Sequence, residues 1–273
     1  MSHIVNRDRV PFLIMSEQGP GNQAERANGA TTMSTYLLVH GAWHSGQCWE
    51  RVVPLLESAG HRVVAPSLTG YGDKAHLLSR EVGLDTHVED VVRLIIEEDL
   101  TEVVLVGHSY AGLVISSAAN QVPDRIAHLV YLDAMVPEDG ESAADVMPVT
   151  QVLIDLAAKS DVDWRVPPLP EMPPPQGLFG VTDPADVAWL RTMLSDQPVR
   201  CLRQPVRLDN PAVNTIPRTH IHCVGDQPEG VARRPVPEVQ PNGTPAQVWE
   251  LATGHDCMIT MPVELTELLL KLG

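Results

Sequence analysis

The amino-acid sequence predicts an α/β fold built on a mostly parallel, doubly wound sheet with helices on both faces. Short runs rich in Val, Leu and Ile recur along the chain, as expected for strands buried on both faces. Amphipathic helical stretches separate these runs, and strands that alternate with helices form parallel sheets. Several runs end at glycine or polar residues, which would gather at the carboxyl edge of the sheet, where ligands bind in such folds.

Each element follows from a local pattern. The predicted strands cover residues 36–39, 61–66, 103–106, 126–132, 220–224 and 247–251. The predicted helices cover 48–59, a stretch starting at the capping box Thr86–Glu89, 109–122 and 262–272. One more helix should have Asp183 as its cap and Pro184 at its first position.

The domain organisation follows from where this alternation starts and breaks. Residues 1–33 are expected to be a flexible leader, because 16–32 is rich in Gly, Asn, Gln and Ala and has no apolar period. Residues 34–273 would then form one α/β domain. Within it, about residues 135–208 are proline-rich and follow the end of a strand. We expect this insertion to form a lid over the groove, with a simple linker as the alternative.

Composition narrows the partners. The 273 residues include 19 Lys and Arg against 35 Asp and Glu, for a net charge of −16. Such a charge argues against nucleic acid or an anionic membrane as a partner and suits a small neutral ligand. The four cysteines, at positions 48, 201, 223 and 257, show no metal-binding spacing, so reduced thiols in a cytoplasmic protein are expected. The sequence also shows no apolar run of membrane-spanning length and no convincing signal peptide.

The stretch Gly107–Ala111 carries the strongest chemical signal. It reads Gly-His-Ser-Tyr-Ala between a buried strand and an apolar helix, close to the G-x-S-x-G pattern. In that pattern a sharp strand-to-helix turn lifts a serine hydroxyl above the sheet as a nucleophile. Ser109 is therefore the candidate nucleophile, and a helix cap is the ordinary alternative.

Two further loops would complete an acyl-transfer site. His40–His44 follows the first strand, and the backbone N–H groups of Ala42 and Tyr110 are the expected oxyanion hole. His255 follows the last strand, so it is the expected general base. The acid that orients it could be Asp133 or Asp226, since each ends a strand and both keep the order serine, acid, histidine.

Three motifs together resemble the α/β-hydrolase superfamily. They are His40-Gly-Ala-Trp-His44, Gly107-His-Ser-Tyr-Ala-Gly112 and Gly254-His-Asp256. The resemblance is greatest to the branch of plant methylesterases, hydroxynitrile lyases and related bacterial ester and carbamate hydrolases. In that branch the acid falls two residues after the Asp of an Asp-Gln pair, where this chain has Pro228. Other α/β-hydrolases, such as haloalkane dehalogenases, place the acid where Asp133 stands, so Asp133 is favoured over Asp226.

The resemblance also implies the reaction type. Hydroxynitrile lyases of the branch carry a hydroxyl residue at the position of Gly41 and a lysine at that of Asp256, so hydrolysis of an ester-like bond is favoured. We expect a cofactor-free and metal-free esterase that acts on a small neutral or apolar molecule, with a homodimer as a further assembly to test. The alternatives are carbamate, amide or C–C hydrolysis, or a non-catalytic small-molecule-binding member of the fold.

Overall fold

The computed structural model describes residues 33–225 and 233–273. A parallel sheet of six strands forms its centre, in the order β2-β1-β3-β4-β7-β8. The strands are β1 (Thr35–Val39), β2 (Arg62–Val64), β3 (Val103–His108), β4 (Ile126–Leu132), β7 (Arg218–Cys223) and β8 (Gln247–Leu251). The α/β fold class predicted from the sequence is confirmed. The order reverses between β1 and β3, and such a switch point is where open parallel sheets bind ligands.

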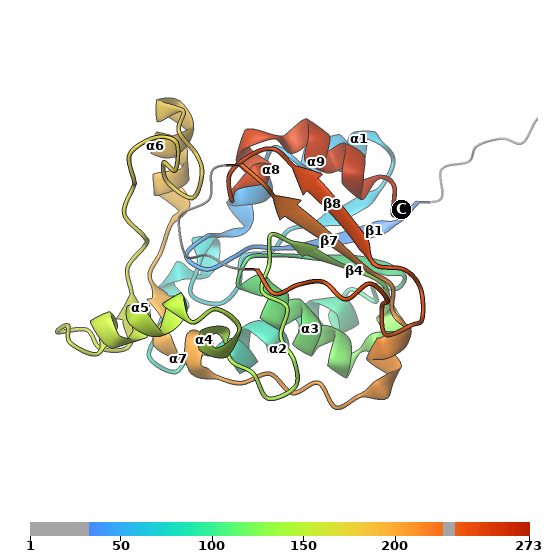
Figure 1. The fold of residues 1–273 in the computed structure, drawn as a ribbon, viewed down its shortest axis with the longest axis horizontal. Helices are drawn as coiled ribbons and strands as arrows, with labels where there is room; N and C mark the ends of the chain where they lie inside the picture. Colours follow the sequence, from blue (N-terminus) through green and yellow to red (C-terminus); the bar gives the residue numbers. More distant parts are fainter. Residues whose placement is uncertain (1–32, 226–232) are drawn as a thin grey trace, which may run out of the picture. The chain divides into compact units, whose positions relative to one another are not determined.

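The sheet divides the apolar core in two because successive strand residues point to opposite faces. In β1, Leu37 and Val39 join one core, while Tyr36 and Leu38 join the other. Helices α2 (Leu84–Glu97) and α3 (Ala111–Gln121) cover the first face. Helices α1 (Val53–Ser58), α8 (Cys257–Thr260) and α9 (Pro262–Leu269) cover the second, as Figure 1 shows.

Helix boundaries differ from the sequence prediction in two places. Helix α2 begins at Leu84, not after a cap at Thr86, because Gly83 is the cap and donates its N–H to the Thr86 hydroxyl at 3.1 Å. The helix predicted over 48–59 is split into a 3₁₀ turn, Gly46–Trp49, and α1. The Asp183 cap is confirmed, since its carboxylate accepts the N–H groups of Ala185 and Asp186 at the start of α6 (Pro184–Met193).

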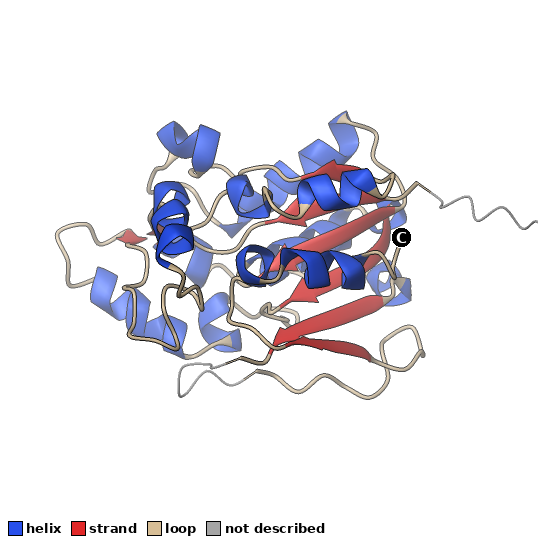
Figure 2. Cartoon of the chain, turned by 90° about the horizontal axis from the view of Figure 1, so that it is seen from above, coloured by secondary structure: helices blue, strands red, loops and turns tan. Residues whose placement is uncertain are grey.

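The segment 135–208, here called the cap region, carries more helix than its prolines indicated. It contains α4 (Ala143–Val146), α5 (Val149–Ala157), α6 and α7 (Val199–Arg203), with β5 (Arg165–Val166) paired antiparallel to β6 (Gln197–Pro198). These elements lie beyond the carboxyl ends of the central strands (Figures 1 and 2). Backbone hydrogen bonds tie the region to loops below it, among them those from Ser195 N–H to the Trp43 carbonyl (2.8 Å) and from Asp256 N–H to the Phe179 carbonyl (2.9 Å).

No helix in the described ranges is long and apolar enough to cross a membrane. The predicted leader falls almost wholly on residues 1–32, which lie outside the described ranges, as does Asp226.

Candidate active site

Ser109 occupies a strained turn between β3 and α3. Its φ of 56° lies in the left-handed region, which residues with a Cβ rarely adopt. The turn is held from the neighbouring strand, because Ser109 N–H donates to the Leu132 carbonyl (3.1 Å) and Met135 N–H donates to the Ser109 carbonyl (3.0 Å). The same hydrogen bonds therefore fix the serine and the segment that contains Asp133.

Small residues around Ser109 are required by close backbone approach. A Cβ added at Gly112 would lie 1.8 Å from the Met135 carbonyl oxygen. A Cβ added at Gly41 would lie 2.9 Å from the Cβ of Ser109. Any side chain at position 41, including the hydroxyl residue of the lyases, would thus crowd the serine.

His255 lies in the loop between β8 and α8, with its ring hydrogen-bonded to Asp133. The His255 Nδ1 to Asp133 Oδ2 distance is 2.6 Å, and the exposed fractions of the two side chains are 26% and 4%. Burial lowers the pKa of His255, but the hydrogen bond and charge of Asp133 outweigh it, so the pKa lies above 6.5. An ionised Asp133 can only accept, so Nδ1 carries the proton and Nε2 is left as the base.

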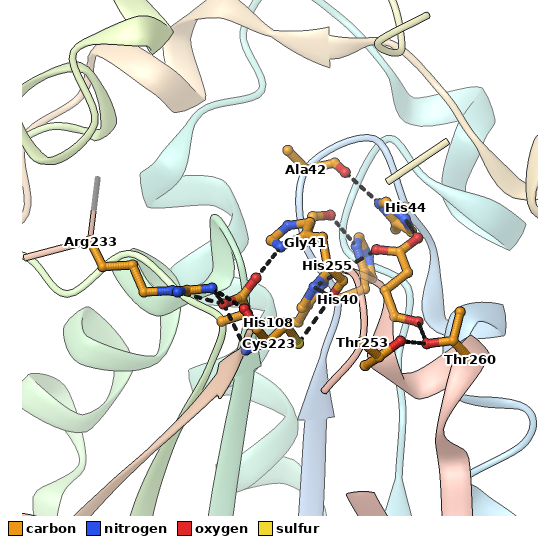
Figure 3. Close-up of polar contacts among 12 residues, drawn as sticks. His40, Gly41, Ala42, His44, His108, Cys223, Arg233, Thr253, His255 and Thr260 are labelled. Atoms are coloured by element: carbon orange, nitrogen blue, oxygen red, sulfur yellow. Dashed lines mark hydrogen bonds and ion pairs between the residues drawn. The ribbon is translucent and has the colours of Figure 1, made fainter. Parts of the chain in front are cut away.

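The other carboxylate oxygen of Asp133 is also occupied. Asp133 Oδ1 accepts hydrogen bonds from the Cys223 N–H at 3.2 Å and from Arg233 Nε and Nη2 at 3.1 and 2.6 Å. Figure 3 shows the Arg233 side chain extending toward Cys223. Burial would raise the pKa of Asp133, but the hydrogen bonds and charges of His255 and Arg233 hold it well below its ordinary value. Asp133 is therefore ionised at neutral pH.

The loop after β1 and the turn after β3 each contribute one residue with a free backbone N–H to the lining of the cavity. Ala42 and Tyr110 line it together with Ser109, and neither backbone N–H donates to any acceptor in the described part of the chain. His40 orients the Ala42 N–H. Leu68 N–H donates to its Nε2 at 3.0 Å, so Nδ1 carries the proton and donates to the Gly41 carbonyl at 2.9 Å. That carbonyl and the Ala42 N–H belong to one peptide unit and point in opposite directions.

His44 links this loop to the histidine loop (Figure 3). Its Nδ1 lies 2.7 Å from the Ala42 carbonyl and its Nε2 lies 2.8 Å from Asp256 Oδ2, and both residues are buried. Because a carbonyl only accepts, Nδ1 donates. A second proton must therefore lie between His44 Nε2 and Asp256 Oδ2. It is either on the ring, which gives an imidazolium beside a carboxylate, or on the carboxyl group, which leaves both groups neutral. Burial raises the pKa of Asp256, but the charge and hydrogen bond of His44 more than offset this and lower it.

A cavity of about 400 Å³ lies over Ser109 and His255. Among the described residues that line it, His255 and the Tyr110 phenol are the only ionisable groups, and most of the lining is apolar. Residues contributed by the cap region include Met135, Met147, Val149, Leu153, Leu169 and Phe179. This volume is at the lower end of small-molecule sites, and an apolar wall would leave a charged ligand without solvation.

The family that matches residues 36–268 is described as the alpha/beta hydrolase family. The carbendazim hydrolyzing esterase of Nocardioides sp. (strain SG-4G) is 36% identical over 247 residues, covering 88% of this chain and 100% of the relative. The chain belongs to the α/β-hydrolase family.

Two further comparisons support the assignment of this chain to the α/β-hydrolases. Methylesterase 2 of Arabidopsis thaliana is 37% identical over 113 residues, which is 41% of this chain and 43% of the relative. An extracellular α/β-hydrolase from a Paenibacillus species superimposes with a TM-score of 0.69 at 25% identity, covering 88% of this chain and 99% of that one. The resemblance noted in the sequence motifs is thereby confirmed at the level of the superfamily.

The structure of this hydrolase also limits where a metal could bind. Ligand atoms of His108, His255 and Asp256 lie within 4.8 Å of one another. However, His108 Nε2 lies 3.1 Å from the His255 carbonyl, so it carries a proton and donates there. The pKa of His108 is lowered to about 3 by burial and by the His255 charge, so the ring is neutral. A nitrogen that bears a proton cannot ligate, so only Nδ1 of His108 could do so, and we assign no metal to this cluster.

Two residues of the site carried no sequence signal for their role. His40 was noted only as part of the oxyanion loop, and Arg233 was not singled out. The Arg233–Asp133 contact joins residues 100 positions apart. A hydrogen bond over such a distance leaves no local pattern, whereas the Ser109 turn and the strand-end position of His255 do.

Proposed function

We propose that this α/β-hydrolase is a serine esterase that cleaves an ester-type bond of a small uncharged substrate through an acyl-serine. One observation carries the proposal: Ser109 on its strained turn and His255, bonded to Asp133 at 2.6 Å, line the same apolar cavity. A serine hydroxyl needs a neighbouring base to become a nucleophile, and His255 Nε2 is the nitrogen left free to take its proton.

The mechanism follows from these positions. Ser109 Oγ attacks the substrate carbonyl as His255 Nε2 takes its proton, and Asp133 stabilises the imidazolium through Nδ1–H. The negative oxygen that forms is bound by the N–H groups of Ala42 and Tyr110. His255 then returns the proton to the departing alcohol, and water releases the acyl group by the same steps in reverse order.

The environment of the site supports hydrolysis over cyanohydrin cleavage. Departing cyanide needs a positive group beside the catalytic histidine, and here that position is Asp256, whose lowered pKa keeps it ionised. Among the relatives are a carbendazim hydrolyzing esterase, a pyrethroid hydrolase and plant methylesterases. They suggest carbendazim, a pyrethroid and methyl esters as the first substrates to test. Hydrolysis of a carbamate would use the same residues and is the second candidate.

Burst kinetics test the proposal directly. Wild type mixed with excess short-chain nitrophenyl ester should release about one equivalent of nitrophenol rapidly and then turn over steadily. Ser109→Ala should lose both phases while keeping its circular dichroism spectrum. Binding of the ester without any release would instead indicate a non-catalytic member of the fold. Near-wild-type turnover by Ser109→Ala would overturn the serine mechanism.

A further inference from the structure

Arg233 contacts the proposed triad from a loop outside it. The residue follows β7, and its guanidinium donates through two nitrogens to Asp133 Oδ1 and through Nη2 to the Cys223 carbonyl. Its side chain is 33% exposed, whereas that of Asp133 is only 4% exposed. The arginine thus brings a positive charge from the surface onto a buried carboxylate.

We propose that Arg233 is a positioning residue that fixes the Asp133 carboxylate toward His255 and sets the protonation of that histidine. This rests on the proposed function. Nε and Nη2 of the planar Arg233 guanidinium both donate to the single oxygen Oδ1, which holds that oxygen on the arginine side of the carboxylate. With Oδ1 held by Arg233 and the Cys223 N–H, Oδ2 is the oxygen that remains for His255 Nδ1.

The position of Asp133 explains why such a residue is needed. Its φ of 44° lies in the left-handed region, and its backbone N–H is already used by the Ile221 carbonyl at 2.7 Å. Desolvation penalises a carboxylate there, so an opposite charge is required to keep it ionised. The arginine comes from the stretch after β7, the strand after which the branch that this chain resembles usually carries its acid.

Arg233 also opposes the effect of Asp133 on the histidine. In the described part of the chain, the charged or titratable groups around His255 include Asp133 after β4, Asp256 beside it, His108 on β3, Cys223 at the end of β7 and Arg233 after β7, and His222 on β7 lies near the Arg233–Asp133 pair. Asp133 and Asp256 favour the imidazolium, while Arg233 disfavours it. His108 is neutral, and the pKa of His222 is lowered, chiefly by burial. Arg233 is therefore the permanent positive charge that keeps His255 available as a base.

The test separates charge from geometry with two substitutions. Arg233→Met removes both, so kcat should fall about 10- to 100-fold, the range usual for partners that orient a functional ligand. The acidic limb of the kcat/KM profile should also move up by about one pH unit, because the imidazolium is no longer opposed. Arg233→Lys keeps a positive charge without the fork. It should hold the limb near that of wild type while kcat falls about 10-fold.

Arg234→Met is the matched control. Arg234 is 31% exposed and pairs with Glu141 at 2.6 Å, so it has similar burial in the same stretch but does not contact Asp133. Its loss should leave the acidic limb in place. If Arg233→Met lowers only the melting temperature, with the limb unmoved, Arg233 is structural and the proposal is wrong.

A readout without substrate lets the inference fail or hold separately from the proposed function. The His255 ring can be titrated by nitrogen NMR in the Ser109→Ala background, with and without Arg233→Lys or Arg233→Met. A higher His255 pKa in the methionine variant alone supports the proposal. Equal pKa values in all three proteins overturn it, whether or not the wild-type protein hydrolyses esters.

Discussion

Asp133→Asn should inactivate the enzyme by imposing the wrong histidine tautomer. From the described residues, Asp133 Oδ1 accepts three hydrogen bonds, two from Arg233 and one from the Cys223 N–H. An asparagine in the same place must keep its oxygen there, because its NH₂ group would meet three donors. The NH₂ group would then face His255 Nδ1, which would have to accept, and the ring proton would move to Nε2.

The size of the effect follows from that tautomer. With Nε2 protonated, His255 cannot take the Ser109 proton, and loss of the correct tautomer in a serine triad costs on the order of 10⁴ in kcat. This corresponds to about 5.4 kcal/mol of transition-state stabilisation. Steady-state hydrolysis of a nitrophenyl ester from pH 6 to 9 measures it, with calorimetric melting to verify folding.

A companion variant tests the orientation argument itself. Asp133→Asn combined with Arg233→Met leaves one donor, the Cys223 N–H, on the Oδ1 side, so the amide can turn its oxygen to His255. The double variant should be more active than Asp133→Asn alone. More than about 1% of wild-type kcat in the single variant, set against the 10⁴ expected, would refute the assignment of Asp133 as the acid.

Three further outcomes are expected. In wild type, kcat/KM should fall as the pH drops below the pKa of His255, because only the neutral ring is a base. Asp133 raises that pKa above 6.5, so an acidic limb below pH 6.5 would contradict this. Tyr110→Phe should keep kcat within a few-fold but lower stability by about 1 kcal/mol in urea unfolding, since its hydroxyl donates to buried His87 Nδ1 at 3.0 Å, away from Ser109. His40→Phe should lower kcat about 10-fold with KM little changed, because the Gly41–Ala42 peptide loses the N–H that orients it, while a pure KM effect would refute that role.

The fold was predictable because buried strands and amphipathic helices leave periodic patterns. The apolar runs at 103–106 and 126–132 fall within β3 and β4, and the residues after them lie at the carboxyl edge of the sheet. The hydrogen bonds that set where a helix begins were harder to predict. Thr86 accepts from Gly83 N–H instead of capping a helix itself, so α2 begins earlier than the pattern indicated. Helix α5 was missed because the prolines of the cap region dominate its composition.

For the candidate site, sequence reasoning located residues with a backbone signature and missed those defined by long-range contact. Ser109 stands in a turn that requires small neighbours, and His255 directly follows a strand. Asp133 and Asp226 each follow a predicted strand, and only the family resemblance favoured Asp133. In the structure the Asp133 carboxylate binds His255, while Asp226 lies outside the described residues. Arg233 depends on the fold to bring it to Asp133, which no local pattern records.

The hydrogen bonds between the cap region and the loops beneath it bear on how substrate enters. Swinging this region away as a hinged body would break the Asp256–Phe179 and Ser195–Trp43 backbone bonds, which hold the base loop and the oxyanion loop. The cap region could therefore not open while these two loops are held in the positions that catalysis needs. Entry without that loss can use rotation of flexible thioethers in the cavity wall, such as Met135, Met147 and Met172, which takes nanoseconds rather than milliseconds. A gate of this kind selects substrates by width, and its opening should not limit the turnover rate.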